Sequence, residues 1–290
     1  MAEGEHRAGV VALLGRPNAG KSTLLNRLLG SKLAIVSAKP QTTRSRILGI
    51  LNLEGAQVLL FDTPGFHGGS KPLNEALNEI VDQVALGCEA GLLLVDRTRG
   101  WEDDHAALAQ RFAEMDKPLV VVANKSDLSS GKAAGWPAGA PKPLEISALT
   151  GAGVDALLER IVSLLPPSPP LYPGDEISDR PMRFLVAELV REAAFDALDQ
   201  ELPYALAVEV VEYDEKRSDL TRIRADLIVE RASQKQIVIG RGGQAIKHIG
   251  TRARREIERL VGGKVYLDLW VKVEPKWSRK PNRLKTLGYN

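Results

Sequence analysis

Short apolar runs alternate with stretches of helical spacing along the first 165 residues. Leu, Ile and Val recur three or four positions apart over residues 21–29 and again over 153–165. The apolar runs are typical of buried strands and span residues 10–14, 47–53, 57–62, 91–96, 119–124 and 144–147. Glu54-Gly55-Ala56 joins the second run to the third, which indicates a hairpin. The pattern predicts an α/β domain, in which helices cover both faces of a mostly parallel sheet with one antiparallel strand.

Beyond residue 181 the order of the pattern changes. The predicted elements are a helix over 182–198, strands over 206–213 and 221–230, helices over 234–239 and 244–261, and a final strand over 264–273. Since strands here no longer alternate regularly with helices, this part is predicted to form a separate α+β domain.

A proline-rich stretch, residues 165–174, separates the two patterns. Prolines remove backbone donors and disfavour helix in the residue before them, so the stretch is predicted to be an extended linker. We therefore expect a first domain over 1–166, a linker over 167–181 and a second domain over 182–290.

The bulk composition describes a globular protein of the cytoplasm. The 290 residues are 44% hydrophobic and 26% charged. A single cysteine, Cys88, excludes an internal disulfide and favours a reducing compartment. No apolar run reaches the roughly 18–20 residues that span a bilayer, and the polar first residues do not resemble a secretory signal.

Charge is distributed unevenly along the chain, although the net charge is only +2. Residues 1–181 contain 18 Lys and Arg against 21 Asp and Glu, while residues 235–290 contain 14 against 4. The basic excess indicates a polyanionic partner for the C-terminal part, and a solvated basic face is the alternative.

The loop after the first predicted strand reads Gly15-Arg-Pro-Asn-Ala-Gly-Lys-Ser22 and fits the pattern G-x-x-x-x-G-K-[ST]. Backbone N–H groups of such a loop surround a phosphate, Lys21 reaches the β- and γ-phosphates, and the Ser22 hydroxyl binds Mg²⁺. An ordinary glycine turn is the alternative, but a strand precedes this loop and a helix follows it. The predicted phosphate-binding residues are Gly15, Asn18, Ala19, Gly20, Lys21, Ser22 and Thr23.

Three further motifs follow predicted strands. Asp62-Thr63-Pro64-Gly65 offers a carboxylate for Mg²⁺ and a glycine for close approach of the backbone to the γ-phosphate. Asp127, in Asn124-Lys-Ser-Asp127, can accept from both N–H groups of guanine, which adenine cannot match. Asn124 would brace this site, Lys125 would lie along the base, and Ser147-Ala148-Leu149 offers N–H groups to guanine O6. The motifs together predict a GTP or GDP site.

Residues 238–250 resemble the signature of KH domains, with Gly240-Arg241-Gly242-Gly243 as its GxxG loop. Such a loop brings the backbone close to nucleotide phosphates, and neighbouring isoleucines form an apolar floor for bases. Arg254 and Arg255 are further candidates for phosphate contact, whereas Trp270 could equally belong to the core. The predicted RNA-binding residues are Lys235, Ile239, Gly240, Arg241, Gly242, Gly243, Ile246, Lys247, Arg252, Lys276 and Trp277. A flexible basic tail is the alternative for the last two.

Over essentially its whole length the chain resembles the Era family of bacterial GTPases, of the TrmE–Era–EngA group, in which a GTP-binding domain precedes a type II KH domain. The resemblance implies that Gln41–Arg44 is the first switch and that Thr43, or else Thr42, binds Mg²⁺. The implied metal ligands are Ser22, Thr43 and Asp62, and the implied catalytic residues are Lys21, Thr43, Asp62 and Gly65.

The resemblance also implies a K⁺ ion near Asn18, and a role in maturation of the small ribosomal subunit through the 3′ end of 16S ribosomal RNA. No DNA partner is expected. Phe66 stands where Ras-like proteins place the Gln that orients the attacking water, so slow intrinsic hydrolysis is expected. Two alternatives stay open: an RNA-binding module in which hydrolysis is incidental, and a peripheral contact of the basic C-terminal region with the inner membrane.

Overall fold

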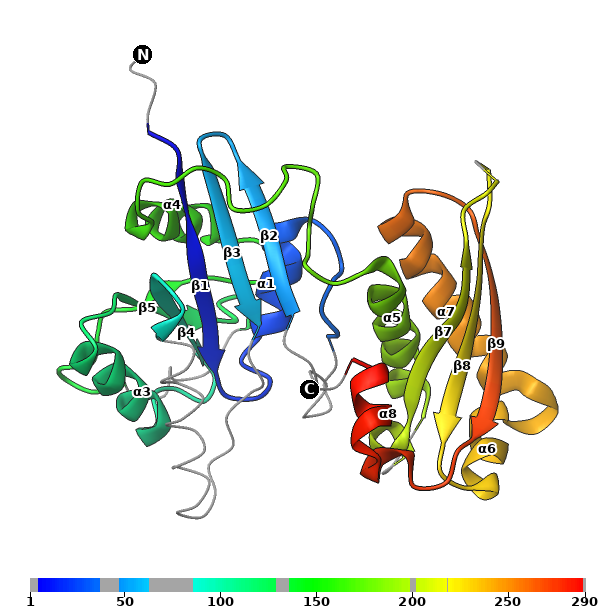
Figure 1. The fold of residues 1–290 in the computed structure, drawn as a ribbon. Coiled ribbons are helices and arrows are strands. Elements are labelled where there is room, and N and C mark those ends of the chain that lie inside the picture. Colours follow the sequence, from blue (N-terminus) through cyan, green and yellow to red (C-terminus); the bar gives the residue numbers. More distant parts are fainter. Residues whose placement is uncertain are drawn as a thin grey trace. The chain divides into compact units, whose positions relative to one another are not determined.

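The computed structural model describes residues 5–36, 47–62, 86–128, 136–198, 202–217 and 219–288. Thr43, Thr63, Gly65 and Phe66 therefore lie outside the described residues. The chain forms two compact units (Figure 1). Of the described residues, the first unit holds those up to Ala34 and those from Ile47 to Asp179, and the second holds Ile35, Val36 and those from Arg180 on. In the described part of the chain, no helix is both long and apolar enough to cross a bilayer.

The first unit is built on a six-stranded sheet with the order β2-β3-β1-β4-β5-β6. Only β2 runs antiparallel to its neighbour; the other described pairs are parallel. The strands are β1 (Arg7–Gly15), β2 (Ile47–Leu53), β3 (Ala56–Asp62), β4 (Ala90–Asp96), β5 (Leu119–Asn124) and β6 (Leu144–Glu145). The described helices are α1 (Lys21–Leu29), α3 (Asp103–Glu114) and α4 (Val154–Leu164). The predicted α/β fold with one antiparallel strand is confirmed.

Apolar side chains on both faces of this sheet explain why its strands read as continuous hydrophobic runs. On one face Ala12 and Leu14 of β1 pack with Leu108 and Phe112 of α3. On the other face α1 packs close to β2, where a side chain at Gly49 would meet Leu25. Because the strands are parallel, their carboxyl ends bring the loops that follow them to the same edge.

Residues 166–178, which we name the strap, belong to the segment predicted to be an extended linker, and they lie along β1, β2 and β3. The N–H of Ile50 donates to the Ile177 carbonyl (3.0 Å), and the Ser178 hydroxyl donates to the Leu48 carbonyl (2.7 Å). Tyr172 packs on the apolar face of β2 and β3 that Leu48 and Ile50 help to form. The proline-rich segment is extended, but it belongs to the first unit.

The second unit is a three-stranded sheet with the order β7-β8-β9, which has helices over one face and the C-terminal helix over part of the other (Figure 1). Strand β8 pairs antiparallel with β7 and parallel with β9. Its elements are α5 (Met182–Ala197), β7 (Ala207–Asp214), β8 (Thr221–Val229), α6 (Ala232–Ile239), α7 (Gln244–Val261), β9 (Val265–Val273) and α8 (Pro281–Thr286). Except for α8, this is the predicted order, and the α+β fold is confirmed.

The core of the second unit lies between the sheet and α5, α6 and α7. It includes Val186 and Val190 of α5, Leu227 of β8 and Ile249 and Ala253 of α7, each 3% exposed or less. Because α7 places its apolar residues at helical spacing, one side of it packs on the sheet and the opposite side faces solvent.

Candidate functional site

The phosphate-type loop lies between β1 and α1, at the carboxyl edge of the first sheet. Gly20 has a φ of 99°, and a Cβ there would lie 2.2 Å from the Asn124 Nδ2 atom. Only glycine fits this position, because any side chain would both strain the backbone and collide with that amide. Asn18 also has a positive φ, 63°, and Ala19 is buried. The loop is therefore held in one backbone shape at the N-terminus of α1, a position that favours an anion.

Lys21 is the one cation buried in this loop, with 7% of its surface exposed. Its Nζ donates to the carbonyls of Gly15 (2.8 Å) and Arg16 (3.1 Å). Burial lowers the pKa of Lys21 from 10.5 to about 8, although the charge of Asp62 acts in the opposite direction. A buried ammonium group favours the approach of phosphate oxygens, because their negative charge replaces the contacts with water that the group loses on burial.

Ser22 and Asp62 bring a hydroxyl and a carboxylate together next to the loop. The Ser22 hydroxyl donates to Asp62 Oδ2 at 2.8 Å, and Asp62 is fully buried at the end of β3. Hard oxygen ligands of this type are those that Mg²⁺ prefers. The donor set therefore fits a magnesium ion held by Ser22 and Asp62. Thr43, the third predicted ligand, lies outside the described residues.

Asn124 joins the phosphate-type loop to the loops predicted to bind the base. Its Nδ2 donates to the Ala19 carbonyl (2.8 Å), and its Oδ1 accepts from the Ala148 N–H (2.9 Å). The side chain is 2% exposed and lies at the end of β5. One buried amide thus fixes three loops that are far apart in sequence, which is the bracing role predicted for it.

Asp127 and Ser147, predicted from two different motifs, lie against each other. The Ser147 hydroxyl donates to Asp127 Oδ1 (2.5 Å) and accepts from the Thr150 N–H (3.0 Å). Leu149 is 66% exposed beside them. Arg27 of α1, which the sequence analysis did not single out, donates to the carbonyls of Ala148 and Leu149. The arrangement fixes one Asp127 oxygen and holds the loop that precedes α4.

Asp96 is a second residue that the sequence analysis missed. Its Oδ2 accepts from Lys125 Nζ at 2.6 Å, and its Oδ1 accepts from the hydroxyl (2.7 Å) and N–H (2.9 Å) of Thr98. Burial alone would raise the pKa of Asp96, but the hydrogen bonds from Lys125 and Thr98 outweigh it, so the pKa is lowered. Its position at the end of a buried strand, next to the strand that ends in Asn124, was the available signal.

The predicted GxxG loop joins α6 to α7. Gly240, Gly242 and Gly243 have φ values of 72°, 57° and 79°, and a Cβ at Gly240 would lie 2.7 Å from that of Ala245. Beside the loop, a groove of about 330 Å³ runs between α7 and β9. It is lined by Ile246, Lys247, Gly250, Thr251, Arg254, Leu267 and Leu269. An apolar floor between two cations suits a single-stranded nucleic acid, with bases inside and phosphates at the rim.

Several predicted RNA-binding residues lie elsewhere. Trp277 is 2% exposed, because it packs with Ala207, Ile228 and Leu287 and donates to the Ala205 carbonyl (3.3 Å). Its ring cannot stack on a base, so this prediction is wrong. The segment around it is a 3₁₀ turn followed by α8, not a flexible tail.

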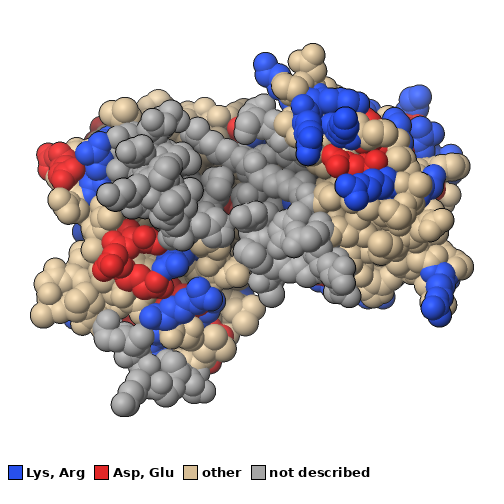
Figure 2. Space-filling model, turned by 90° about the horizontal axis from the view of Figure 1, so that it is seen from below, with Lys and Arg blue, Asp and Glu red and all other residues tan. Residues whose placement is uncertain are grey.

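Of the remaining cations, Arg252 forms an ion pair with Asp196 of α5. Lys276 is exposed. Figure 2 shows Lys and Arg side chains gathered on the second unit, at the end of the sheet where α6 and α8 lie.

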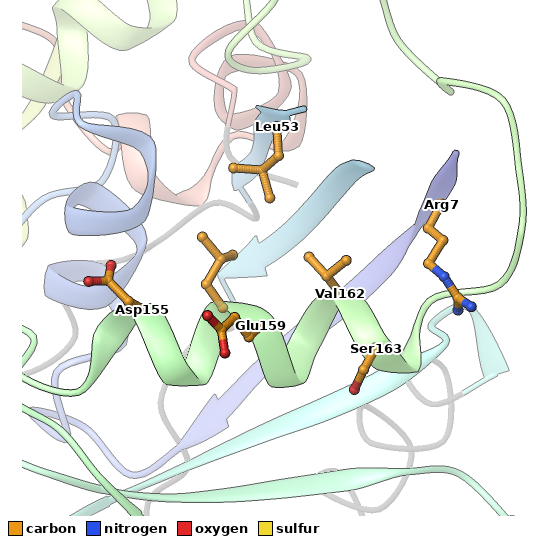
Figure 3. A pocket seen from close by; sticks show the side chains of 7 residues that line it. Arg7, Leu53, Asp155, Glu159, Val162 and Ser163 are labelled. Atoms are coloured by element: carbon orange, nitrogen blue, oxygen red, sulfur yellow. The ribbon is translucent and has the colours of Figure 1, made fainter. Parts of the chain in front are cut away.

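A separate hollow of about 630 Å³ runs along α4 (Figure 3). Val162 of α4 faces Leu53 of β2, with Arg7 at one end and Asp155 at the other, and Leu158 also lines the hollow. None of the predicted phosphate- or base-binding residues lines it. The hollow is therefore distinct from the nucleotide site.

Comparisons with known proteins agree with both units. Residues 10–125 match the family described as 50S ribosome-binding GTPase, and residues 201–278 match the KH domain. The chain is 42% identical to GTPase Era of Geotalea uraniireducens, with all of both chains covered, and 43% identical to that of Stenotrophomonas maltophilia, with 98% of both covered.

Two solved structures are similar over nearly the whole chain. One is an Aquifex aeolicus Era variant bound to GDP and AlF4⁻, and the other is Era in complex with MgGDPNP and nucleotides 1506–1542 of 16S ribosomal RNA. Each is 39% identical to this chain and has a TM-score of 0.84. The match covers 98% of this chain and 99% of the solved chain.

Proposed function

The chain belongs to the Era family of GTPases, and from this we propose that it is a GTP-operated switch that binds the 3′ end of 16S ribosomal RNA and assists maturation of the small ribosomal subunit. As a member of that family it hydrolyses GTP to GDP and phosphate. The observation that carries the proposal is that one chain contains two sites. The first is a nucleotide site braced by Asn124, and the second is a groove beside the GxxG loop. A relative of the same length holds MgGDPNP and 16S ribosomal RNA together.

In the proposed mechanism, the residues of the nucleotide site position the triphosphate and oppose its charge. Lys21 and the N–H groups of the loop contact the β- and γ-phosphates, and Ser22 and Asp62 hold Mg²⁺. When bound, Mg²⁺ would neutralise part of the negative charge on the phosphate oxygens. Thr43 and Gly65 are proposed to complete this set from the two switch segments. Asp127 accepts the two guanine N–H groups, and its bond from Ser147 keeps it in that orientation.

The base specificity has a direct test. Asp127→Ala removes the acceptor of both guanine N–H groups, so GTP and GDP should bind much more weakly while discrimination against ATP is lost. Calorimetry with the three nucleotides measures this. Equal discrimination in the variant and the wild type would contradict the assignment of Asp127.

We further propose that K⁺ binds next to Asn18 and offsets charge between the β- and γ-phosphates. Phe66 cannot orient water, so the site needs another means of stabilising the charge that develops during hydrolysis. Hydrolysis should therefore be faster in KCl than in NaCl at equal ionic strength, and Asn18→Ala should remove the difference. Equal rates in the two salts would exclude the ion.

The comparisons point to two different ribosomal subunits as the target. The matching GTPase family is described by 50S binding, whereas the relative's RNA belongs to the small subunit. We propose the small subunit, because the similar Era structure, which matches this chain over its KH domain as well, holds RNA of that subunit. Co-sedimentation with purified 30S and 50S subunits tests this, and binding to 50S alone would overturn it.

The rival function is an RNA-binding module in which hydrolysis is incidental. The Lys21→Ala variant separates the two, because it removes the phosphate contact and leaves the groove of the second unit intact. In cells lacking the wild-type protein, the switch predicts accumulation of immature small subunits with this variant. Normal subunits would favour the rival.

We place the protein in the cytoplasm, where ribosomes mature. The peripheral membrane contact remains the least favoured proposal, and flotation with anionic liposomes tests it.

A further inference from the structure

One face of the second unit's sheet carries two exposed aromatic rings. Tyr266 and Trp270 of β9 are 59% and 60% exposed. Side chains alternate along a strand, so both rings point away from the face on which Val265, Leu267, Leu269 and Val271 pack with the helices. The sequence did not decide whether Trp270 belongs to the core, and its exposure shows that it does not.

Among the described residues, those that cover this face lie over one part of it. Around Ala207 and Ile228 it is covered by Trp277 and by Leu284 and Leu287 in and after α8. The other part carries the exposed rings, and we name it the open face. It comprises Arg222 and Arg224 of β8 and Tyr266, Asp268 and Trp270 of β9.

One of the two rings on the open face is fixed by a hydrogen bond. Trp270 Nε1 donates to Oδ2 of Asp268 at 2.7 Å, and Asp268 lies between the two aromatic residues on β9. In the pairing of β8 with β9, Arg222 lies beside Tyr266 and Arg224 lies beside Asp268. Aromatic rings fixed on a strand with guanidinium groups beside them form a platform on which bases stack.

We propose that the open face is a second binding surface for single-stranded RNA, on which Tyr266 and Trp270 stack bases that extend beyond the GxxG groove. The proposal rests on the RNA-binding function proposed above. Continuity supports it: β9 is an edge strand, and its Leu267 and Leu269 line the groove while Tyr266 and Trp270 face the other side. An RNA strand that leaves the groove over this edge reaches the two rings directly.

The length of the RNA also favours this occupant. A GxxG fold clamps about four nucleotides. The RNA in the relative's complex, nucleotides 1506–1542, is far longer, so most of it lies outside such a groove. A longer RNA therefore has nucleotides available for a second surface on the same unit.

Stacking, not charge, is expected to dominate on the open face. Glu212 and Asp214 of β7 pair in register with Arg224 and Arg222, and Asp226 and Asp268 lie on the same side. These four carboxylates outnumber the two arginines, so few phosphate counterions are released there. The additional affinity of a long RNA over a short one should thus depend only weakly on salt, whereas binding in the groove should depend strongly on it.

The test compares RNA of nucleotides 1506–1542 with overlapping hexanucleotides from it, of which the tightest binder is the short probe. Tyr266→Ala and Trp270→Ala should each weaken binding of the long RNA by about fivefold to a hundredfold. Binding of the short probe should change by less than about twofold. Trp270→Phe, which keeps a stacking ring, should restore most of the affinity. Leu171→Ala removes a half-exposed apolar side chain from the first unit and serves as the matched control.

Three results would overturn the inference. If the alanine variants bind the long RNA as the wild type does, the open face does not contact RNA and a protein partner becomes the better occupant. If they lose short and long RNA equally, the rings support the groove instead. If the wild type binds neither RNA, the proposed function itself fails, which the first two results leave intact.

Discussion

Because burial lowers the pKa of Lys21, we expect nucleotide affinity to depend on pH. Its pKa of about 8 means that roughly half of the free protein has a neutral Lys21 at pH 8. Phosphate oxygens beside the Nζ atom raise this pKa, so the complex binds more protons than the free protein. Linkage then requires that GDP affinity falls as the pH rises through 8, by up to tenfold per pH unit.

Calorimetry at pH 8.5 in two buffers of different ionisation enthalpy measures this proton uptake. The phosphates of the ligand are already ionised at that pH and do not contribute. Lys21→Ala should abolish the uptake. An absence of uptake in the wild type would mean that Lys21 does not meet the phosphates.

Asp96 is predicted to act through Lys125. The lowered pKa of Asp96 keeps the carboxylate ionised until the pH falls well below neutral, so the 2.6 Å ion pair persists at physiological pH. Asp96→Asn removes the charge and frees the Lys125 side chain from its position beside the base site. Hydrogen bonds to charged groups contribute about 1.5–3 kcal/mol, so GDP binding should weaken about tenfold or more.

Thr98→Val is the matched control for Asp96. It removes one hydroxyl bond to the same carboxylate and leaves the ion pair in place. Its effect on GDP binding should be several times smaller. Equal affinity of Asp96→Asn and the wild type, in folded protein, would show that Lys125 needs no anchor.

Single residues also show which parts of the site could be predicted from the sequence and which could not. Asn124, Asp127 and Ser147 were predicted from motifs, since the chemistry of guanine demands particular groups at strand ends. Trp277 was misjudged because a ring beside lysines looks the same whether it faces solvent or packs under α8. Only the tertiary contact with Ala207 and Ile228 separates the two cases.

At the scale of elements, Gln57 is the main polar anchor of the strap. It is 1% exposed, its Oε1 accepts from the N–H groups of Leu171 (2.7 Å) and Tyr172 (2.9 Å), and its Nε2 donates to the Tyr172 carbonyl (2.9 Å). Gln57→Leu leaves these backbone groups without partners. Each costs about 1–3 kcal/mol unless water reaches it, so we expect about 2–4 kcal/mol less free energy of unfolding and faster cleavage by chymotrypsin after Tyr172.

The Gln57→Glu variant sharpens this experiment. A carboxylate still accepts from both N–H groups, but it is buried and sets an oxygen against the Tyr172 carbonyl, so its loss should be at least as large. Denaturant unfolding with protease digestion measures both variants. A strap that resists cleavage in Gln57→Leu would show that the apolar contacts of Tyr172 hold it alone.

The strap also explains which elements could be predicted and which could not. The strands of the first unit followed from local hydrophobic runs, and Ile47–Leu53 and Leu119–Asn124 have the predicted bounds. The partners of Gln57 in the strap lie more than a hundred residues away, in a segment whose prolines suggest only an extended chain. Local pattern therefore gives the conformation of the strap but not the surface that it covers.

At the scale of the whole molecule, the anchored strap leaves a very short connection between the units. Ser178 is the last residue bonded to β2, and α5 begins at Met182. Since β2 directly follows the segment predicted to carry Thr43, a change there on hydrolysis would reach the second unit through β2 and the strap. A short connection transmits such a change better than a flexible one.

This route predicts that RNA affinity depends on the bound nucleotide and on the length of that connection. Wild-type protein should bind RNA with affinities that differ about 5- to 150-fold between GDP and GDPNP, the usual range of coupling between two sites. Inserting Gly-Ser-Gly-Ser between Asp179 and Arg180 should bring the ratio close to one while each unit keeps its own ligand affinity. The same insertion between Glu54 and Gly55, in the exposed turn of β2 and β3, should leave the ratio unchanged. If the ratio survives the insertion after Asp179, the coupling does not depend on this connection, and the strap serves stability alone.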